Sequence, residues 1–233
     1  MLEFYCAYSD YWDLMDFTEA MLARVAERTV GTLQVPYGED VIDFGACSRL
    51  TMREAVRKYW TAGEPPDDEQ LTDRGRLAEL LSGLETPFDQ SADWGKLLGQ
   101  LFDTVAEERL VQPTIVYDYP VELSPLSKTK DEDPRFVERF ELYIAGFEVA
   151  NAYSELNDPE EQRARFAEQL KERARGDLEA HEMDEDYVRA LRYGMPPTAG
   201  EGVGVDRLTM VLTGRKSIRE VILFPQLRPE GGE

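Results

Sequence analysis

The stretch RFELYIAGFEVANAYSELND, residues 139–158, carries the strongest fold signal in the sequence. Strand-forming residues lie on both sides of Ala145-Gly146, and the wider segment from Phe136 to Leu156 is predicted to form a β-hairpin that turns there. Such a turn fixes the register of the two strands. Tyr143 is then expected opposite Glu148, and Glu141 opposite Ala150.

Two carboxylates follow from that register. Glu141 and Glu148 become diagonal neighbours on one face of the hairpin, with Cβ atoms roughly 7 Å apart. Two carboxylates at that separation can share a hard divalent cation with water and phosphate oxygens. The same pattern also fits two glutamates that face solvent on a half-exposed sheet.

A second group of polar residues follows along the same strand. Asn151, Tyr153 and Glu155 alternate, so they share one face. An amide, an aromatic ring and a carboxylate in a row are suited to the wall of a pocket for a small zwitterion. Their parity is opposite to that of Glu148. All of them can line one site only if a bulge or a strong twist lies between residues 148 and 151; otherwise one group faces away.

The stretch TAGEGVGVDRLTMVL, residues 198–212, is the third candidate. Three alternate glycines permit close approach of the backbone, and they precede a predicted helix over Asp206–Leu212. Arg207 in the first turn of that helix can contact a nucleotide by charge and by stacking. The spacing differs from the dinucleotide-binding fingerprint Gly-x-Gly-x-x-Gly, and it also fits a plain strand-to-helix turn.

The rest of the chain mixes helical and strand patterns, which predicts an α+β fold. Residues 61–92 have the least regular pattern and are interpreted as a helical insertion. The expected elements are a strand at Leu2–Tyr8, an amphipathic helix between Asp10 and Gly31, two short strands within Leu33–Gly45, a helix from the capping box Thr51/Glu54 to about Tyr59, a polar helix at Glu69–Leu81, a buried-face helix at Leu97–Val105, a strand at Thr114–Pro120, a helix that begins at Asp158-Pro159, and a strand at Val221–Phe224.

Composition limits the classes of function. The 233 residues include 47 Asp and Glu against 26 Lys and Arg, a formal net charge of −21, without the clustered cations that grip nucleic acid. No apolar run is long enough to cross a membrane. Cys6 and Cys47 have no metal-like spacing, and the absence of an export signal predicts a cytoplasmic protein. The single histidine, His181, lies in a charged stretch and is not expected to act as a catalytic base.

Four stretches together resemble one family. MLEFYCAYSDYWDLMDFTE (residues 1–19), DYPVELSPLSK (118–128), DEDPRFVERFELYIAGFEVANAYSELND (131–158) and the segment from DEDYVRALRYGMPPTAGEGVGVDRL to its end at FPQLRPE (184–230) closely resemble the C-terminal half of bacterial class II lysyl-tRNA synthetases. The resemblance implies the part of the catalytic domain from the tail of motif 2 to motif 3. It implies an antiparallel sheet with flanking helices, incomplete at its N-terminus.

The resemblance also implies roles for individual residues. Two departures accompany it: Ala152 stands where the family more usually has glycine, which is expected to stiffen or narrow the pocket, and Phe147 stands where it often has arginine. The resemblance implies that Glu141 and Glu148 bind Mg²⁺ at ATP. It implies that Asn151 binds the substrate carboxylate, that Tyr153 forms an aromatic wall of the pocket, and that the lysine ε-ammonium is contacted by Glu3, Tyr5 and Glu155. Arg207 would be the motif 3 arginine, which packs on the ATP adenine and reaches the phosphates.

The implied reaction is ligation of lysine to tRNA(Lys) in two steps, with ATP and Mg²⁺. The acceptor end of the tRNA would be a partner of the full enzyme, and a homodimer or a complementing N-terminal segment would be a partner of this chain. Because the chain begins after the motif 2 arginine, it is expected to be poorly active alone. The alternatives are a non-catalytic relative or partner subunit that binds lysine or an adenylate, and a paralogue that lysylates a protein.

Overall fold

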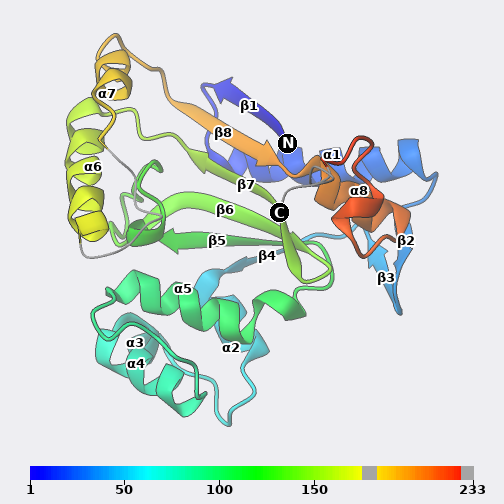
Figure 1. Ribbon diagram of the computed structural model, residues 1–233, viewed down its shortest axis with the longest axis horizontal. Helices are drawn as coiled ribbons and strands as arrows, with labels where there is room; N and C mark the ends of the chain where they lie inside the picture. The colour runs from blue at the N-terminus through cyan, green and yellow to red at the C-terminus, as the bar shows by residue number, and fades with distance from the viewer. Residues whose placement is uncertain (175–182, 227–233) are drawn as a thin grey trace, which may run out of the picture.

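The predicted hairpin forms the middle of a six-stranded sheet in the computed structural model, which describes residues 1–174 and 183–226 (Figure 1). All neighbouring strands of this sheet run antiparallel except β4 and β5, which are parallel. The α+β prediction is therefore confirmed. In spatial order the strands are β1 (Leu2–Ala7), β8 (Thr198–Val203), β7 (Phe147–Ser154), β6 (Phe136–Ile144), β5 (Thr114–Pro120) and β4 (Ser48–Thr51), while β2 (Gln34–Tyr37) and β3 (Asp40–Asp43) form a separate ribbon.

Three helices begin where the sequence predicts their starts. Asp10 accepts hydrogen bonds from the backbone N–H groups of Trp12 and Asp13 at the start of α1, and Thr51 and Glu54 form the expected capping box of α2. Asp158 likewise accepts from the first backbone N–H groups of α6. The main helices are α1 (Tyr11–Thr29), α2 (Met52–Tyr59), α5 (Trp94–Val105), α6 (Pro159–Ala174), α7 (Glu185–Leu191) and α8 (Val205–Thr213), with short 3₁₀ turns η1 (Glu107–Arg109), η2 (Val121–Leu123) and η3 (Ile218–Glu220).

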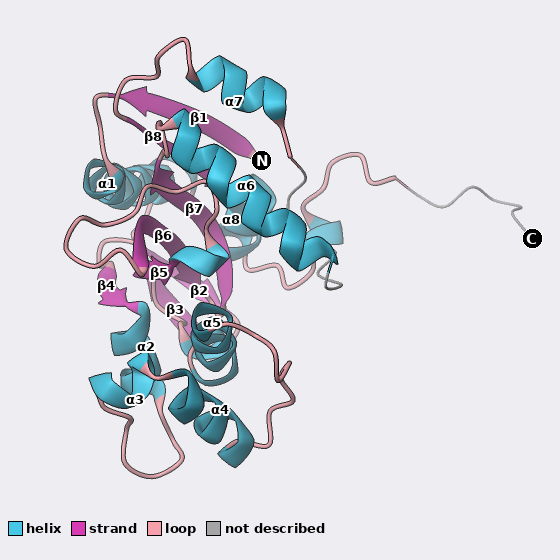
Figure 2. Cartoon of the chain, turned by 90° about the vertical axis from the view of Figure 1, so that its left-hand side faces the viewer, coloured by secondary structure: helices cyan, strands magenta, loops and turns pink. Residues whose placement is uncertain are grey.

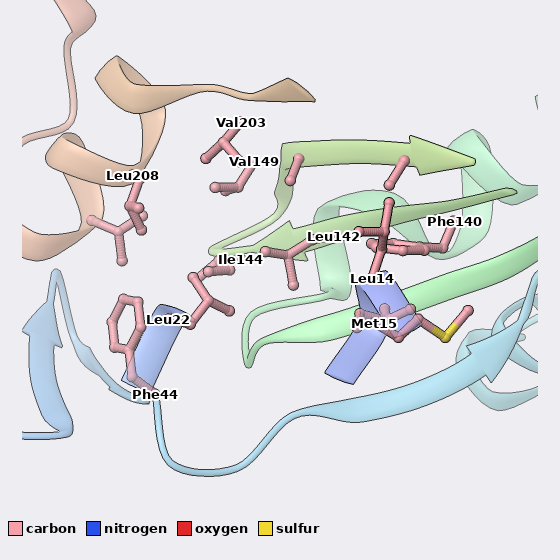
Figure 3. Packing of buried hydrophobic residues seen from close by; sticks show 14 of the residues in the cluster. Leu14, Met15, Leu22, Phe44, Phe140, Leu142, Ile144, Val149, Val203 and Leu208 are labelled. Atoms are coloured by element: carbon pink, nitrogen blue, oxygen red, sulfur yellow. The ribbon is translucent and has the colours of Figure 1, made fainter. Parts of the chain in front are cut away.

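The two faces of the sheet bury different cores. Side chains of α1 such as Leu14, Met15 and Leu22 pack against one face of β6, as the close view shows (Figure 3). The β6 residues on that face are Phe140, Leu142 and Ile144. The other face carries Tyr143 and packs against α2 and α5, which lie beyond β4 and β5 (Figure 2), and α4 (Arg74–Gly83) packs against α5 in turn.

Two predictions of secondary structure are wrong. The polar helix predicted over residues 69–81 is two helices, α3 (Asp68–Thr72) and α4 (Arg74–Gly83), because Asp73 has extended backbone and caps α4 through the N–H of Arg76. The predicted strand Val221–Phe224 follows η3 instead. Phe224 is 91% exposed, and no strand in the described part of the chain lies beside it to supply hydrogen bonds. No helix among residues 1–174 and 183–226 has the length and hydropathy of a membrane span.

Candidate active site

A bulge in the β6–β7 hairpin decides which side chains share a face. Tyr143 lies opposite Glu148 as predicted, but the register then shifts, so Glu141 lies opposite Asn151 rather than Ala150. The prediction for Glu141 is wrong by one residue because Val149 is the extra residue of β7. The shift brings Glu148 and Asn151, which have opposite parity, to the same face. A bulge between residues 148 and 151 is what the sequence analysis required for both groups to line one site.

Two rows of side chains cross four strands on that face. The rows pass through β8 at glycines, so the sheet has no side chains between those of β7 and those of β1. A cavity of about 490 Å³ lies there, and seven of the eight predicted site residues line it. The first row is Glu141, Asn151, Gly202 and Glu3, and the second is Arg139, Tyr153, Gly200 and Tyr5. The seven predicted residues that line the cavity are Glu3, Tyr5, Glu148, Asn151, Tyr153, Glu155 and Arg207.

Glu155 is a buried carboxylate that has no counter-charge among residues 1–174 and 183–226. The residue is only 5% exposed, and its side chain has no hydrogen-bond or ion-pair partner within the described ranges. Burial raises the pKa of Glu155 to about 7. Burial, Glu155 and Glu3 together also raise the pKa of the Tyr5 phenol. This end of the cavity is therefore suited to a cation.

Position 200 requires glycine because the side chains of Glu155 and Tyr5 lie close to its Cα atom. A Cβ atom at Gly200 would lie 2.5 Å from the Glu155 Oε1 atom and 2.9 Å from the Tyr5 ring. At Gly202, two residues along the same face of β8, the nearest atom to a Cβ would be 3.7 Å away. Close approach at Gly200 holds the carboxylate and the phenol at one end of the cavity.

We expect Gly200→Ala to lower the free energy of unfolding by about 1–3 kcal/mol, because the added methyl group displaces Glu155 or Tyr5. Gly202→Ala is the matched control on the same strand, and should be neutral or slightly stabilising. Urea unfolding of both variants measures the difference. Equal stability of the two variants would contradict the assigned packing.

Arg207 occupies the other end of the cavity. Its Nη1 atom donates to the backbone carbonyl of Glu148 at 2.7 Å and to the Glu148 carboxylate at 3.2 Å. Burial raises the pKa of Glu148, and the nearby charge of Glu141 raises it further. Gly204 is the N-cap residue of helix α8 and provides no side-chain hydrogen bond, so no capping side chain binds the N–H groups of the first turn.

Glu141 does not line the main cavity. It lies on the same face but lines a neighbouring cavity of about 330 Å³ beside α5. Its Oε2 atom accepts hydrogen bonds from Tyr119 at 2.9 Å and Tyr143 at 2.5 Å, and its Oε1 atom pairs with Arg139. Glu141 and Glu148 interact as like charges, but the described residues include no cluster of three or more His, Cys, Asp or Glu that suits a metal ion.

Sequence reasoning missed two residues of this region. Arg139 shares the face of Glu141 by strand period, which would have been a usable signal. Glu201 lies between Gly200 and Gly202 on the opposite face, where a carboxylate among core positions was the signal. Ala152 lies in the core beside α1 and does not line the cavity. The expectation that its side chain narrows the pocket is therefore wrong. His181 lies outside the described residues.

Comparison with known proteins places this geometry in a family. The family model described as tRNA synthetases class II (D, K and N) matches residues 1–228. A lysine–tRNA ligase of Aquifex aeolicus is 55% identical over 99% of the chain and 38% of its own length. Those of Moorella thermoacetica and Staphylococcus saprophyticus are 50% and 48% identical, over 99% and 98% of the chain.

These three relatives are longer proteins, and the chain spans 38–46% of their length. Both comparisons run through the strands that form the cavity. With its model matched along nearly the whole sequence, the chain belongs to the class II tRNA synthetases of the D, K and N group.

Proposed function

We propose that this chain carries the lysine- and ATP-binding part of a lysine–tRNA ligase. The observation that supports this best is the buried carboxylate of Glu155, which has no partner in the described part of the chain and lies at one end of a cavity whose other end holds an arginine. Lysine is a zwitterion with an additional terminal cation, which the carboxylate of Glu155 suits, while the arginine at the other end suits the phosphates of ATP. The lysine–tRNA ligases among the relatives support the same substrate.

Recognition of the lysine side chain would fall to Glu155, Glu3 and Tyr5. An ammonium removed from water needs opposite charge and hydrogen-bond acceptors, and two carboxylates with a phenol oxygen provide both. Uncharged side chains of the same length would leave Glu155 buried without compensation, so the pocket should reject them. Tyr153 would form the aromatic wall, and Asn151 would donate to the α-carboxylate.

The ATP end would be formed by Arg207, Glu148 and Glu141. Oxygen ligands from one or two carboxylates, completed by phosphate oxygens and water, suit Mg²⁺, and this pair fits that donor set. When bound, Mg²⁺ would neutralise charge on the phosphates. Arg207 would stack on the adenine and reach the phosphates, which requires it to give up part of its contact with Glu148.

The proposed chemistry has two steps. The lysine carboxylate attacks the α-phosphorus of ATP, so that lysyl-adenylate forms and pyrophosphate leaves. The 3′-terminal hydroxyl of tRNA(Lys) then attacks the lysyl carbonyl, and AMP leaves. Asn151 and Glu155 contribute by holding the carboxylate in line with the phosphate, and Arg207 by stabilising charge that grows on it.

Lysine-dependent ATP–pyrophosphate exchange tests the first step. We expect the 233-residue chain to bind lysine and to catalyse only slow exchange that depends on lysine, and Glu148→Ala to reduce that exchange by about 100-fold. Lysine binding without exchange would favour the alternative of a non-catalytic lysine-binding relative or a partner subunit. Exchange followed by transfer to a protein rather than to tRNA would identify the protein-lysylating alternative.

A further inference from the structure

Arg139 lies between Asn151, on the amino-acid side of the proposed site, and Glu141, on the ATP side. Its guanidinium pairs with Oε1 of Glu141 through Nη2, and its Nε donates to Oδ1 of Asn151 at 3.1 Å. Its Nη1 donates to the carbonyl of Leu123 at 2.7 Å and to the hydroxyl of Ser124 at 2.8 Å. The side chain is only 15% exposed. One guanidinium therefore connects β6, β7 and the turn that follows β5.

The contact with Asn151 fixes the orientation of its amide. Arginine is a donor only, so it must face the amide oxygen, and the amide nitrogen is left for the cavity that Asn151 lines. The cavity thereby receives two N–H donors rather than a carbonyl. A carboxylate is the ligand group that two such donors suit.

The contact with Glu141 restricts its free acceptor positions. A carboxylate has about four lone-pair positions. Tyr119 and Tyr143 donate to Oε2, while Arg139 donates to Oε1. One position remains, and it belongs to Oε1. The guanidinium, stacked with its Cζ atom 4.8 Å from the Tyr119 ring centre, holds that oxygen in place.

We propose that Arg139 is a positioning residue that selects for the carboxylate of the amino-acid substrate, by turning the amide nitrogen of Asn151 into the cavity, while it orients Glu141 on the ATP side. This inference rests on the proposed function. It goes further by assigning carboxylate selectivity to a residue that does not line the main cavity. Arg139 would act through Asn151 rather than by touching the substrate.

Lysine and lysinamide distinguish this role from a merely structural one. Both ligands carry the two amino groups, but lysinamide has a neutral carboxamide that gains less from the Asn151 donors. Arg139→Lys keeps the positive charge and loses the planar fork that holds four acceptors at once. By isothermal titration calorimetry on the 233-residue chain, we expect lysine affinity to fall about tenfold in this variant and lysinamide affinity to change less than threefold.

Asn151→Asp provides a second variant that does not depend on the stability of Arg139→Lys. The aspartate keeps an acceptor for Arg139 but presents an oxygen to the cavity in place of the donors. Preference should then reverse from lysine to lysinamide. In the double variant Arg139→Lys with Asn151→Ala, lysine affinity should match that of Asn151→Ala alone within about twofold, because Arg139 acts through the amide.

Each other outcome identifies what has failed. Equal losses for both ligands, or an unchanged lysine affinity in Asn151→Asp, would overturn the positioning role while the parent chain still binds lysine. A parent chain that does not bind lysine would overturn the proposed function, and this inference with it, before any variant is compared.

Discussion

Replacement of Glu155 by glutamine is expected to weaken lysine binding by about 2 kcal/mol, roughly 30-fold, at pH 8.5. The carboxylate is buried and has no other partner among the described residues. In the glutamine variant, the ammonium of the bound lysine would therefore lose the nearest opposite charge. Loss of one member of a buried charge pair leaves the other under-compensated, which costs more than the same loss at the surface. Isothermal titration calorimetry measures the change directly.

The pH dependence sharpens this prediction. Because burial raises the pKa of Glu155 to about 7, the free site is protonated at lower pH and must lose that proton when it pairs with the ammonium. Lysine affinity of the parent chain should rise as pH increases to about 7 and level off above it. Glu155→Gln should lack this step, so the gap between the two proteins narrows to a few-fold at pH 6.

Norleucine is the matched ligand control, because it has no terminal ammonium. Its affinity for the parent chain should be low at pH 8.5, and Glu155→Gln should leave it unchanged or raise it, because the neutral amide is not left as an uncompensated buried charge. Equal lysine affinities in the two proteins at pH 8.5 would remove Glu155 from the recognition of the side chain.

The hairpin illustrates what the sequence can predict. Ala145-Gly146 marks the turn by local chemistry, and both residues have positive φ, at 57° and 80°. The first pairs beyond the turn follow from it. The position of the bulge does not, because it depends on how Val149 packs beside Val203 and Leu208, residues about 50 positions away that are labelled in Figure 3.

The cavity required information that is not local. Glu3 joins Asn151 only because β1 and β8 pair in one particular register across about 200 residues, and strand period alone is silent on that register. The resemblance to the family, not periodicity, brought Glu3 and Tyr5 into the predicted site. Conversely, the apolar run Val221–Phe224 has a strand-like composition but no neighbouring strand in the described part of the chain, so local pattern was misleading there.

Glu201→Gln is expected to stabilise the chain by about 2–3 kcal/mol at pH 8.5. Glu201 lies in the middle of β8 and faces α1, only 3% exposed. Its Oε1 atom accepts a hydrogen bond from Thr18 at 2.9 Å, and its buried Oε2 atom has no partner in the described structure. Burial raises the pKa of Glu201 to about 7, and the Thr18 hydrogen bond offsets only part of that rise.

The sign of the effect follows from the raised pKa. The folded state favours the protonated carboxyl, so its contribution to stability is fully present below the unfolded pKa, near 4.5, and is lost as pH rises through about 7. Glutamine keeps the shape and the acceptor for Thr18 without ever becoming charged. Urea unfolding should therefore show nearly equal stability for parent and variant at pH 5 and a clear advantage for the variant at pH 8.5.

Glu79→Gln, on the exposed face of α4, should show no such divergence. Parallel stability curves for parent and Glu201→Gln would mean that the carboxylate is compensated in the folded chain. A clear divergence would mean that Glu201 of β8 packs against α1 as a neutral acid below pH 7, and that its ionisation above that pH destabilises the folded chain.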